Sequence, residues 1–289
     1  ISVDTKNTEL IGNFKNSGAL WSQKADEVSM YDFPGDAECR AVPYGVYDIH
    51  HKRGHVSVGT SADTPQFAVH AIRDWWKQTG SKQYTDAKEL LITADSGGSN
   101  GHRPRLWKRE LQRWADEEGL AITVAHYPRG ASKWNDIEHR LFGSITNNWA
   151  GLPLRSLGLM LNAIRGTTNE GGLSVTARHD RHVYHKKIKV PDKEMKQLSL
   201  QDTKRAPLEL YDQAEDEIRE VISVQVLSPY QPELAQTHKV WTATPKYLAA
   251  SGRVSRSLDT VADMFVYSVN DACLSINPSI IAYFLHRAT

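Results

Sequence analysis

Two acidic residues occupy positions at which a carboxylate could do chemistry. Asp95 follows the apolar run Leu90–Ala94 and precedes the glycine-containing segment Ser96–Gly101. Apolar runs bounded by glycine are typical of buried strands, and open α/β sheets carry their sites at the ends of such strands. Glu138 lies on the apolar stripe of a predicted helix at Lys133–Phe142. Because an inward carboxylate is costly unless a cation or hydrogen bonds compensate it, the two residues together indicate a divalent-metal site.

Asp4, in a predicted strand at Ile1–Lys6, adds a third carboxylate. In the predicted sheet the first and fourth strands are neighbours, so Asp4 can meet Asp95, and Glu138 can close the site from the flank. Three carboxylates in a small space do not all stay ionised alone, and Mg²⁺ or Mn²⁺ removes this conflict. Two such ions about 3.5–4 Å apart can activate an attacking hydroxyl and stabilise the leaving oxygen of a phosphodiester.

The elements that must position these residues form an α/β pattern. Val46–His50 and His55–Gly59 predict a hairpin that turns near Gly54, after an irregular segment at Glu9–Pro43. Thr64 and Pro65 begin a helix that we expect to end at Gly80. The remaining predicted elements are the strand that ends at Asp95, a helix at Pro104–Glu118, a strand at Leu120–His126 and the Glu138 helix. This order predicts a mixed five-stranded sheet with helices on both faces.

The pattern weakens after about residue 150. Leu157–Ile164 predicts a helix, and Leu208–Val221 is a candidate for an acidic helix. No clear periodicity follows Pro229. We therefore expect an irregular C-terminal extension.

Composition limits the classes of function. The 289 residues carry a net charge of +1, so any contact with nucleic acid must come from local basic clusters. The two cysteines, Cys39 and Cys273, favour a reducing cytosolic setting without a disulfide framework. The sequence has no apolar run long enough for a membrane span and no basic-then-apolar segment at its start, so we expect neither a span nor a leader in these residues. Because it starts at Ile1 in a predicted strand, we expect the chain to begin inside a domain.

Four stretches carry a resemblance to a known family, and their order along the chain makes it specific. The sequence resembles the DDE transposase domain of the Rhodopirellula-type insertion-sequence family, which is typed from an Azoarcus element. The similarity runs from residue 1 to roughly residue 200. The stretches are Ile1–Asn16, Pro43–Asp48, Leu91–Asn100 and Ser132–Phe142.

The resemblance implies a ribonuclease H-like fold and metal-dependent cleavage and transfer of DNA strands. It places the catalytic, metal-binding triad on Asp4, Asp95 and Glu138, with two Mg²⁺ ions that Mn²⁺ can replace. It also implies DNA as the partner, a homo-oligomer on DNA and a place in the bacterial cytosol near the nucleoid. We expect residues 1–200 to form the catalytic domain and residues 201–289 an extension. The N-terminal helix-turn-helix region usual in this family is absent from the sequence.

Basic residues near the triad are candidates for DNA contact, because phosphate contacts supply most sequence-independent affinity. A solvated charged face is the alternative. The candidates are Lys6, Arg103, Arg105, Lys108 and Lys133. His179, His182 and His185 recur at every third residue, but their neighbours are basic and no companion ligand cluster follows. We expect them on a basic strand near DNA rather than in a zinc site.

Other interpretations remain open at this stage. Asp48 lies on a neighbouring strand, and we expect a structural role for it; the helical angle of Asp136 directs it away from Glu138. The chain could be an active transposase domain, an inactive or repurposed DNA-binding remnant, or a related nuclease that cuts without joining. An intact triad should bind Mn²⁺, and only a product assay separates cutting from joining.

Overall fold

The computed structural model describes residues 1–127, 135–203 and 223–227. Nearly all of them belong to one compact unit, Ile1–Asp202 with Val221–Tyr230. A second unit, Thr203–Glu220 with Gln231–Thr289, lies almost wholly outside the described residues, as do Lys133, the predicted acidic helix and most of the predicted extension. Within the described ranges, no helix is both long and apolar enough to cross a membrane.

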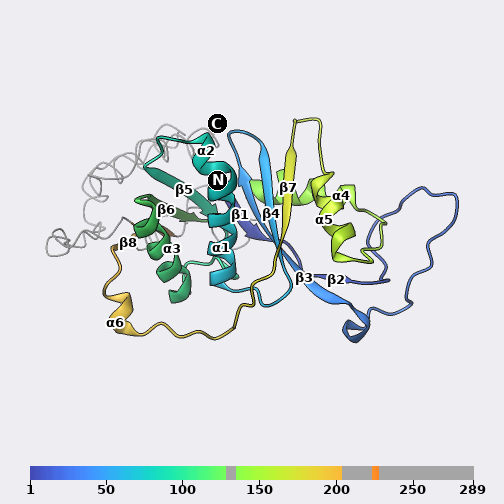
Figure 1. Ribbon diagram of the computed structural model, residues 1–289, viewed down its shortest axis with the longest axis horizontal. Coiled ribbons are helices and arrows are strands. Elements are labelled where there is room, and N and C mark those ends of the chain that lie inside the picture. The colour runs from blue at the N-terminus through green and yellow to red at the C-terminus, as the bar shows by residue number, and fades with distance from the viewer. Residues whose placement is uncertain (128–134, 204–222, 228–289) are drawn as a thin grey trace, which may run out of the picture. The chain divides into compact units, whose positions relative to one another are not determined.

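A mixed sheet forms the centre of the first unit (Figure 1). The five predicted strands are present at its middle: β1 (Ser2–Thr5), β3 (Cys39–Asp48), β4 (Arg53–Gly59), β5 (Glu89–Ala94) and β6 (Ala121–His126). β1 pairs antiparallel with β3 and parallel with β5, which confirms that the first and fourth predicted strands are neighbours. The α/β class and an architecture consistent with a ribonuclease H-like fold are therefore confirmed.

Four further strands enlarge the sheet beyond the five that the sequence predicts. They are β2 (Glu9–Ile11), β7 (Ser174–Asp180), β8 (Leu200–Thr203) and β9 (Ser223–Leu227). The strand order is β7-β4-β3-β1-β5-β6-β9-β8, and β2 pairs with β3. β7 covers the outer edge of β4 and β9 covers that of β6, so both edges of the predicted sheet are paired. Pairing an edge strand is one way to satisfy its exposed backbone groups.

The hairpin of β3 and β4 differs from the prediction in two ways. β3 begins at Cys39, so the irregular segment ends earlier than Pro43. The chain turns between Asp48 and Arg53 rather than near Gly54, and Lys52 takes the left-handed conformation there (φ 54°). Gly54 instead lies within β4, opposite Tyr47.

Two helices cover one face of the sheet. α1 (Pro65–Trp75) begins as predicted, with the Thr64 hydroxyl accepting a hydrogen bond from the Phe67 N–H. The helical path does not stop at Gly80, because it continues through a π-helical turn η2 (Trp76–Gly80) into α2 (Ser81–Gln83). α3 (Arg105–Glu118) ends as predicted at Gly119, which is left-handed (φ 66°). Their apolar faces form a core with β1, β3, β5 and β6.

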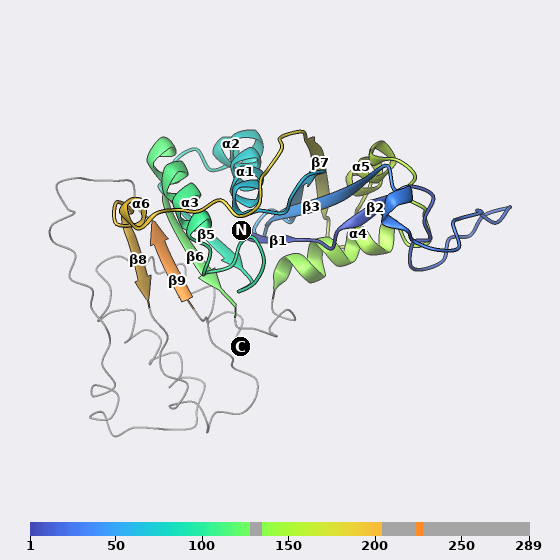
Figure 2. The ribbon, with the colours of Figure 1, turned by 90° about the horizontal axis from the view of Figure 1, so that it is seen from below.

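The opposite face carries the segment that contains Glu138. The π-helical turn η4 (Glu138–Phe142) leads into α4 (Gly143–Asn148), and α5 (Leu157–Arg165) follows as predicted. Figure 2 shows α1 and α3 on one side of the sheet and α4 on the other. The remaining short helices are η1 (Pro34–Asp36) and α6 (Asp192–Met195). Helices on both faces were predicted, and the structure confirms them.

Glycines in the sheet let η4 lie close to it. A β-carbon on Gly45 would lie 2.6 Å from the Phe142 ring and 2.8 Å from Ile137 Cδ1, and one on Gly54 would collide with Leu141. Ile137, Leu141 and Phe142 are buried in the core of this face. The absence of side chains at Gly45 and Gly54 therefore lets η4 pack close to the sheet, and this packing determines the position of Glu138.

Candidate active site

The sheet register brings Asp4 level with Asp95. In the parallel pair of β1 and β5, Ser2 lies opposite Thr93 and Val3 opposite Ala94. The next residue along each strand is Asp4, in β1, and Asp95, the first residue after β5. Because β1 runs parallel to β5, both side chains emerge at the same end of the sheet, where α/β proteins place their sites.

Glu138 reaches this end from η4, and a chain of hydrogen bonds attaches the start of that turn to β1. The Ser2 hydroxyl donates to Asn135 Oδ1 (2.7 Å) and accepts from the Ile137 N–H (3.4 Å). The Asn135 amide also donates to Asp4 Oδ2 (3.4 Å). Sequence reasoning missed Ser2 and Asn135. Their signals were the place of Ser2 on the Asp4 face of its strand and that of Asn135 three residues before Glu138.

Neighbouring carboxylates raise the pKa values of Asp4 and Asp95. The pKa of Asp4 is raised to about 9, first by burial, then by the charge of Asp95 and by the charge of Glu138 and a hydrogen bond with it. The Thr5 N–H opposes this rise by donating to Asp4 Oδ1 (2.7 Å). The pKa of Asp95 is also raised, by burial and by Glu138, while the Gly97 N–H and the Asn100 amide act in the opposite direction. Asp4, Asp95 and Glu138 thus form a group in which the charges of Asp95 and Glu138 act on Asp4, and that of Glu138 acts on Asp95.

Such a group fits hard divalent cations. Carboxylate oxygens are the ligands of Mg²⁺ and Mn²⁺, and their mutual repulsion is what a bound cation relieves. In the part of the chain that the structure describes, the triad is not among the groups of three potential ligands whose atoms all lie within 4.8 Å of one another.

The loop after β5 fixes the orientation of Asp95. Asp95 Oδ1 accepts hydrogen bonds from the Gly97 N–H (3.3 Å) and the Asn100 amide (3.2 Å). His126, the last residue of β6, approaches the Asn100 carbonyl at 2.9 Å. Gly98 turns the loop in the left-handed region (φ 63°). The glycine-containing loop therefore holds the Asp95 carboxylate in one orientation through these hydrogen bonds.

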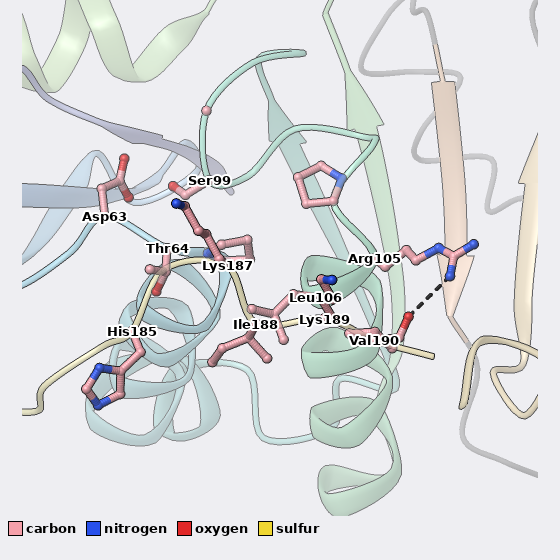
Figure 3. A pocket seen from close by; sticks show the side chains of 13 residues that line it. Asp63, Thr64, Ser99, Arg105, Leu106, His185, Lys187, Ile188, Lys189 and Val190 are labelled. Carbon is pink, nitrogen blue, oxygen red and sulfur yellow. Dashed lines mark hydrogen bonds between the residues drawn. The ribbon is translucent and has the colours of Figure 1, made fainter. Parts of the chain in front are cut away.

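A cavity of about 650 Å³ lies beside this loop, and basic side chains line it (Figure 3). Asp63 and Ser99 line one part of it, and both lie near Thr5, the neighbour of Asp4: Thr5 Oγ1 is 3.5 Å from Asp63 and 3.3 Å from Ser99. Lys187 points toward Asp63 and Ser99 in Figure 3. The other basic residues of the lining are Arg105, His185 and Lys189.

Comparison with known proteins identifies the family. The family model described as the Rhodopirellula transposase DDE domain matches residues 1–211. The chain belongs to this family. No curated protein and no solved structure matches it. A transposase domain acts on DNA, so DNA is the partner that the family implies.

Within this transposase domain, several predicted DNA-contacting residues already have partners in the protein. The Lys6 ammonium lies 3.3 Å from Glu9 and 4.9 Å from the centre of the Trp149 ring. Arg105 pairs with Asp192 (2.6 Å) and donates to the Val190 carbonyl. Lys108 has an interaction partner as well, Arg103 is exposed, and Lys133 lies outside the described residues.

Asp48 and Asp136, the two other carboxylates weighed from the sequence, have hydrogen-bond or ion-pair partners of their own. Asp48 is buried and accepts hydrogen bonds from the His50 and His51 N–H groups and from the Tyr84 hydroxyl. Asp136 is buried and pairs with Arg140 (3.1 Å). Asp48 thereby closes the turn after β3.

Proposed function

We propose that this chain is the catalytic domain of a transposase that cleaves DNA at the ends of an insertion sequence and joins the freed 3′-hydroxyl to target DNA. Asp4, Asp95 and Glu138 are its catalytic residues and hold two Mg²⁺ ions, which Mn²⁺ can replace. The observation that carries this proposal is that the charges of Asp95 and Glu138 raise the pKa of Asp4 and that the charge of Glu138 raises the pKa of Asp95, although the three residues come from β1, the loop after β5 and η4.

Each carboxylate has a distinct place in the proposed reaction. Asp4 and Asp95 would hold the ion that activates the attacking hydroxyl, and Glu138 would help to hold the ion that stabilises the leaving oxygen. The bound ions supply activation of the nucleophile and stabilisation of the leaving group. The Thr5 N–H and the Asn100 amide keep the first two carboxylates in fixed orientations. Positioning of this kind is the main contribution of a protein to phosphoryl transfer.

Basic residues beside the triad contact the DNA backbone in this proposal. Arg103, Arg105, Lys108, Lys133 and Lys6 remain the proposed contacts from sequence, and DNA must compete with Glu9 for Lys6 and with Asp192 for Arg105. Lys187 and Lys189 join them, because they line the cavity next to Ser99. We further propose that residues 1–200 are the catalytic domain and residues 201–289 an extension, and that the protein acts as a homo-oligomer on DNA in the bacterial cytosol.

A product assay with Asp95→Asn tests the proposal. The full chain is incubated with labelled duplexes that carry the ends of the element, with and without a target duplex, in Mg²⁺. We expect cleaved and joined products from the parent and a loss of at least about 100-fold in Asp95→Asn, because an isosteric amide cannot replace the charge. Asp86→Asn, at an exposed turn position, is the matched control and should keep full activity.

The products separate the remaining alternatives. Equal cleavage by a folded Asp95→Asn variant would refute the assigned triad. Cleavage without joining would identify a nuclease. Absence of both products from the parent would identify a remnant that no longer turns over.

A further inference from the structure

Two histidines and an aspartate converge at the end of β7, beside α1. His182 Nδ1 lies 2.6 Å from Asp180 Oδ1, and His70 Nδ1 lies 3.2 Å from Asp180 Oδ2. The ligand atoms of these residues all lie within 4.8 Å of one another, the one such group of three found in residues 1–127, 135–203 and 223–227. We propose that His70, Asp180 and His182 bind a divalent transition-metal ion, with Zn²⁺ as the best match.

The burial of the three side chains suits an ion that enters from solvent. The Asp180 side chain is only 8% exposed, whereas His70 is 42% and His182 68% exposed. Each imidazole directs its Nδ1 atom at a different oxygen of the same carboxylate. A bound ion takes the place of the hydrogens in these contacts, with each neutral ring carrying its proton on Nε2 instead. The buried carboxylate is thus held in place, and both histidine side chains are partly exposed to solvent.

The chemistry of the ligands selects the kind of metal. Two imidazole nitrogens and one carboxylate match the ligands of Zn²⁺, whereas Mg²⁺ prefers oxygen ligands alone. The Tyr184 hydroxyl donates to Asp180 Oδ2 (2.6 Å) and lies 2.5 Å from His70 Nδ1. Hydrogen-bonded partners of this kind orient the ligands of metal sites. Three protein ligands leave a fourth position for water.

The ion would fasten the basic segment that lines the cavity. Residues 181–190 form neither helix nor strand between β7 and α6. Near its start, the Ser61 hydroxyl donates to the His182 carbonyl (3.3 Å) and accepts from the Tyr184 N–H (3.1 Å). Lys187 and Lys189 follow within seven residues of His182 and line the cavity beside Ser99. A metal bond through His182 would therefore fix where these lysines lie.

Metal titration tests the site without any measurement of activity. The full chain is stripped with a chelator and titrated with Zn²⁺ by calorimetry and with Co²⁺ by absorption spectroscopy, in an Asp95→Asn background that weakens binding at the triad. We expect one equivalent of Zn²⁺ to bind and tetrahedral Co²⁺ bands to appear. His182→Ala should weaken binding by at least about tenfold, since even loss of a group that supports a ligand costs 10–100-fold.

The controls make the result decisive and independent of the proposed function. His185→Ala removes a neighbouring histidine outside the group and should leave affinity unchanged. His70→Ala provides a second test, and far-ultraviolet circular dichroism verifies folding of each variant. Unchanged Zn²⁺ affinity in folded His182→Ala and His70→Ala, or absence of Zn²⁺ binding by the parent, would overturn the proposal and show a hydrogen-bonded cluster only.

Discussion

At the scale of single residues, Asp4 is the carboxylate of the candidate site whose pKa is raised to about 9. It is buried next to Asp95 and Glu138, and the ordinary value of this pKa is 3.8. The folded, ion-free chain therefore holds a proton on Asp4 more tightly than the unfolded chain does. Sites that carry out chemistry commonly sacrifice stability in this way.

The stability of the ion-free protein should consequently fall as pH rises. Between about pH 4 and 9 the folded state binds more protons than the unfolded state, so the free energy of unfolding decreases with pH. Asp4→Asn removes the contribution of Asp4 to this dependence and should stabilise the chelated protein at pH 8 by about 0.5–2 kcal/mol. Urea unfolding in a chelator at several pH values measures the effect. An identical pH dependence in parent and variant would contradict it.

Asn135 should matter for both stability and position. Asn135→Ala removes the acceptor of the Ser2 hydroxyl and a donor to Asp4, and we expect a loss of about 1–3 kcal/mol because buried polar groups are left unpaired. DNA cleavage should fall as Glu138 loses its attachment to β1. Chemical denaturation and the cleavage assay measure the two effects. Asn147→Ala, at an exposed position of α4, is the control that should change neither.

The sequence was informative about these residues to different degrees. Asp95 and Glu138 could be singled out because a strand end and an apolar helical stripe are local patterns. The Ser2–Asn135 bond joins residues 133 positions apart and depends on how η4 packs on the sheet, which no local pattern contains. The His70–Asp180–His182 group was missed for the same reason, because His70 comes from a different element. The spacing of three nearby histidines directed attention to His179 and His185 instead.

At the scale of elements, capped helices were predictable and π-helical turns were not. Thr64 and Gly119 mark helix ends through local backbone chemistry, and both ends lie where predicted. η2 and η4 are π-helical turns with no local sequence signal, and η2 carries the helix after Thr64 through Gly80 into α2. The short strands β2 and β9 have too few residues for a clear alternation.

The close approach of η4 to β3 should tolerate no added side chain. Gly45→Ala places a methyl group 2.6 Å from the Phe142 ring, and we expect a loss of about 1–3 kcal/mol from overpacking, together with reduced cleavage as Glu138 moves. Thermal unfolding and the cleavage assay measure these effects. Gly35→Ala, where a β-carbon meets no atom within 4 Å, is the matched control. Equal stability of the two variants would show that η4 can shift freely.

At the scale of the whole molecule, the sheet is completed by a strand from far along the chain. β9 pairs antiparallel with β6, and Leu227 is fully buried in the core beneath α1 and α3. The sequence showed no reason to join residues 223–227 to the catalytic domain, because the preceding stretch no longer follows the family pattern. The family match itself ends at residue 211.

Leu227 should therefore contribute to the stability of the entire domain. Leu227→Ala is expected to lower the free energy of unfolding by about 2–5 kcal/mol, the usual cost of deleting a buried leucine side chain. Leu20→Ala, at a position that is 56% exposed, is the control and should change stability little. Denaturant unfolding followed by tryptophan fluorescence reports on the core. A neutral Leu227→Ala variant would show that β9 does not belong to the folded domain.

The brevity of β1 has a mechanical consequence. β3 and β4 on one side, and β5 and β6 on the other, are joined by long ladders. The ladder between β1 and β5 has two residue pairs, at Ser2 and Val3, and Ile1 adds hydrogen bonds to β5. Asp4 and Asp95 stand on opposite sides of this narrow seam. A ligand bound by both carboxylates would therefore link the two halves of the sheet. Binding at the reactive centre would then also stabilise the domain as a whole.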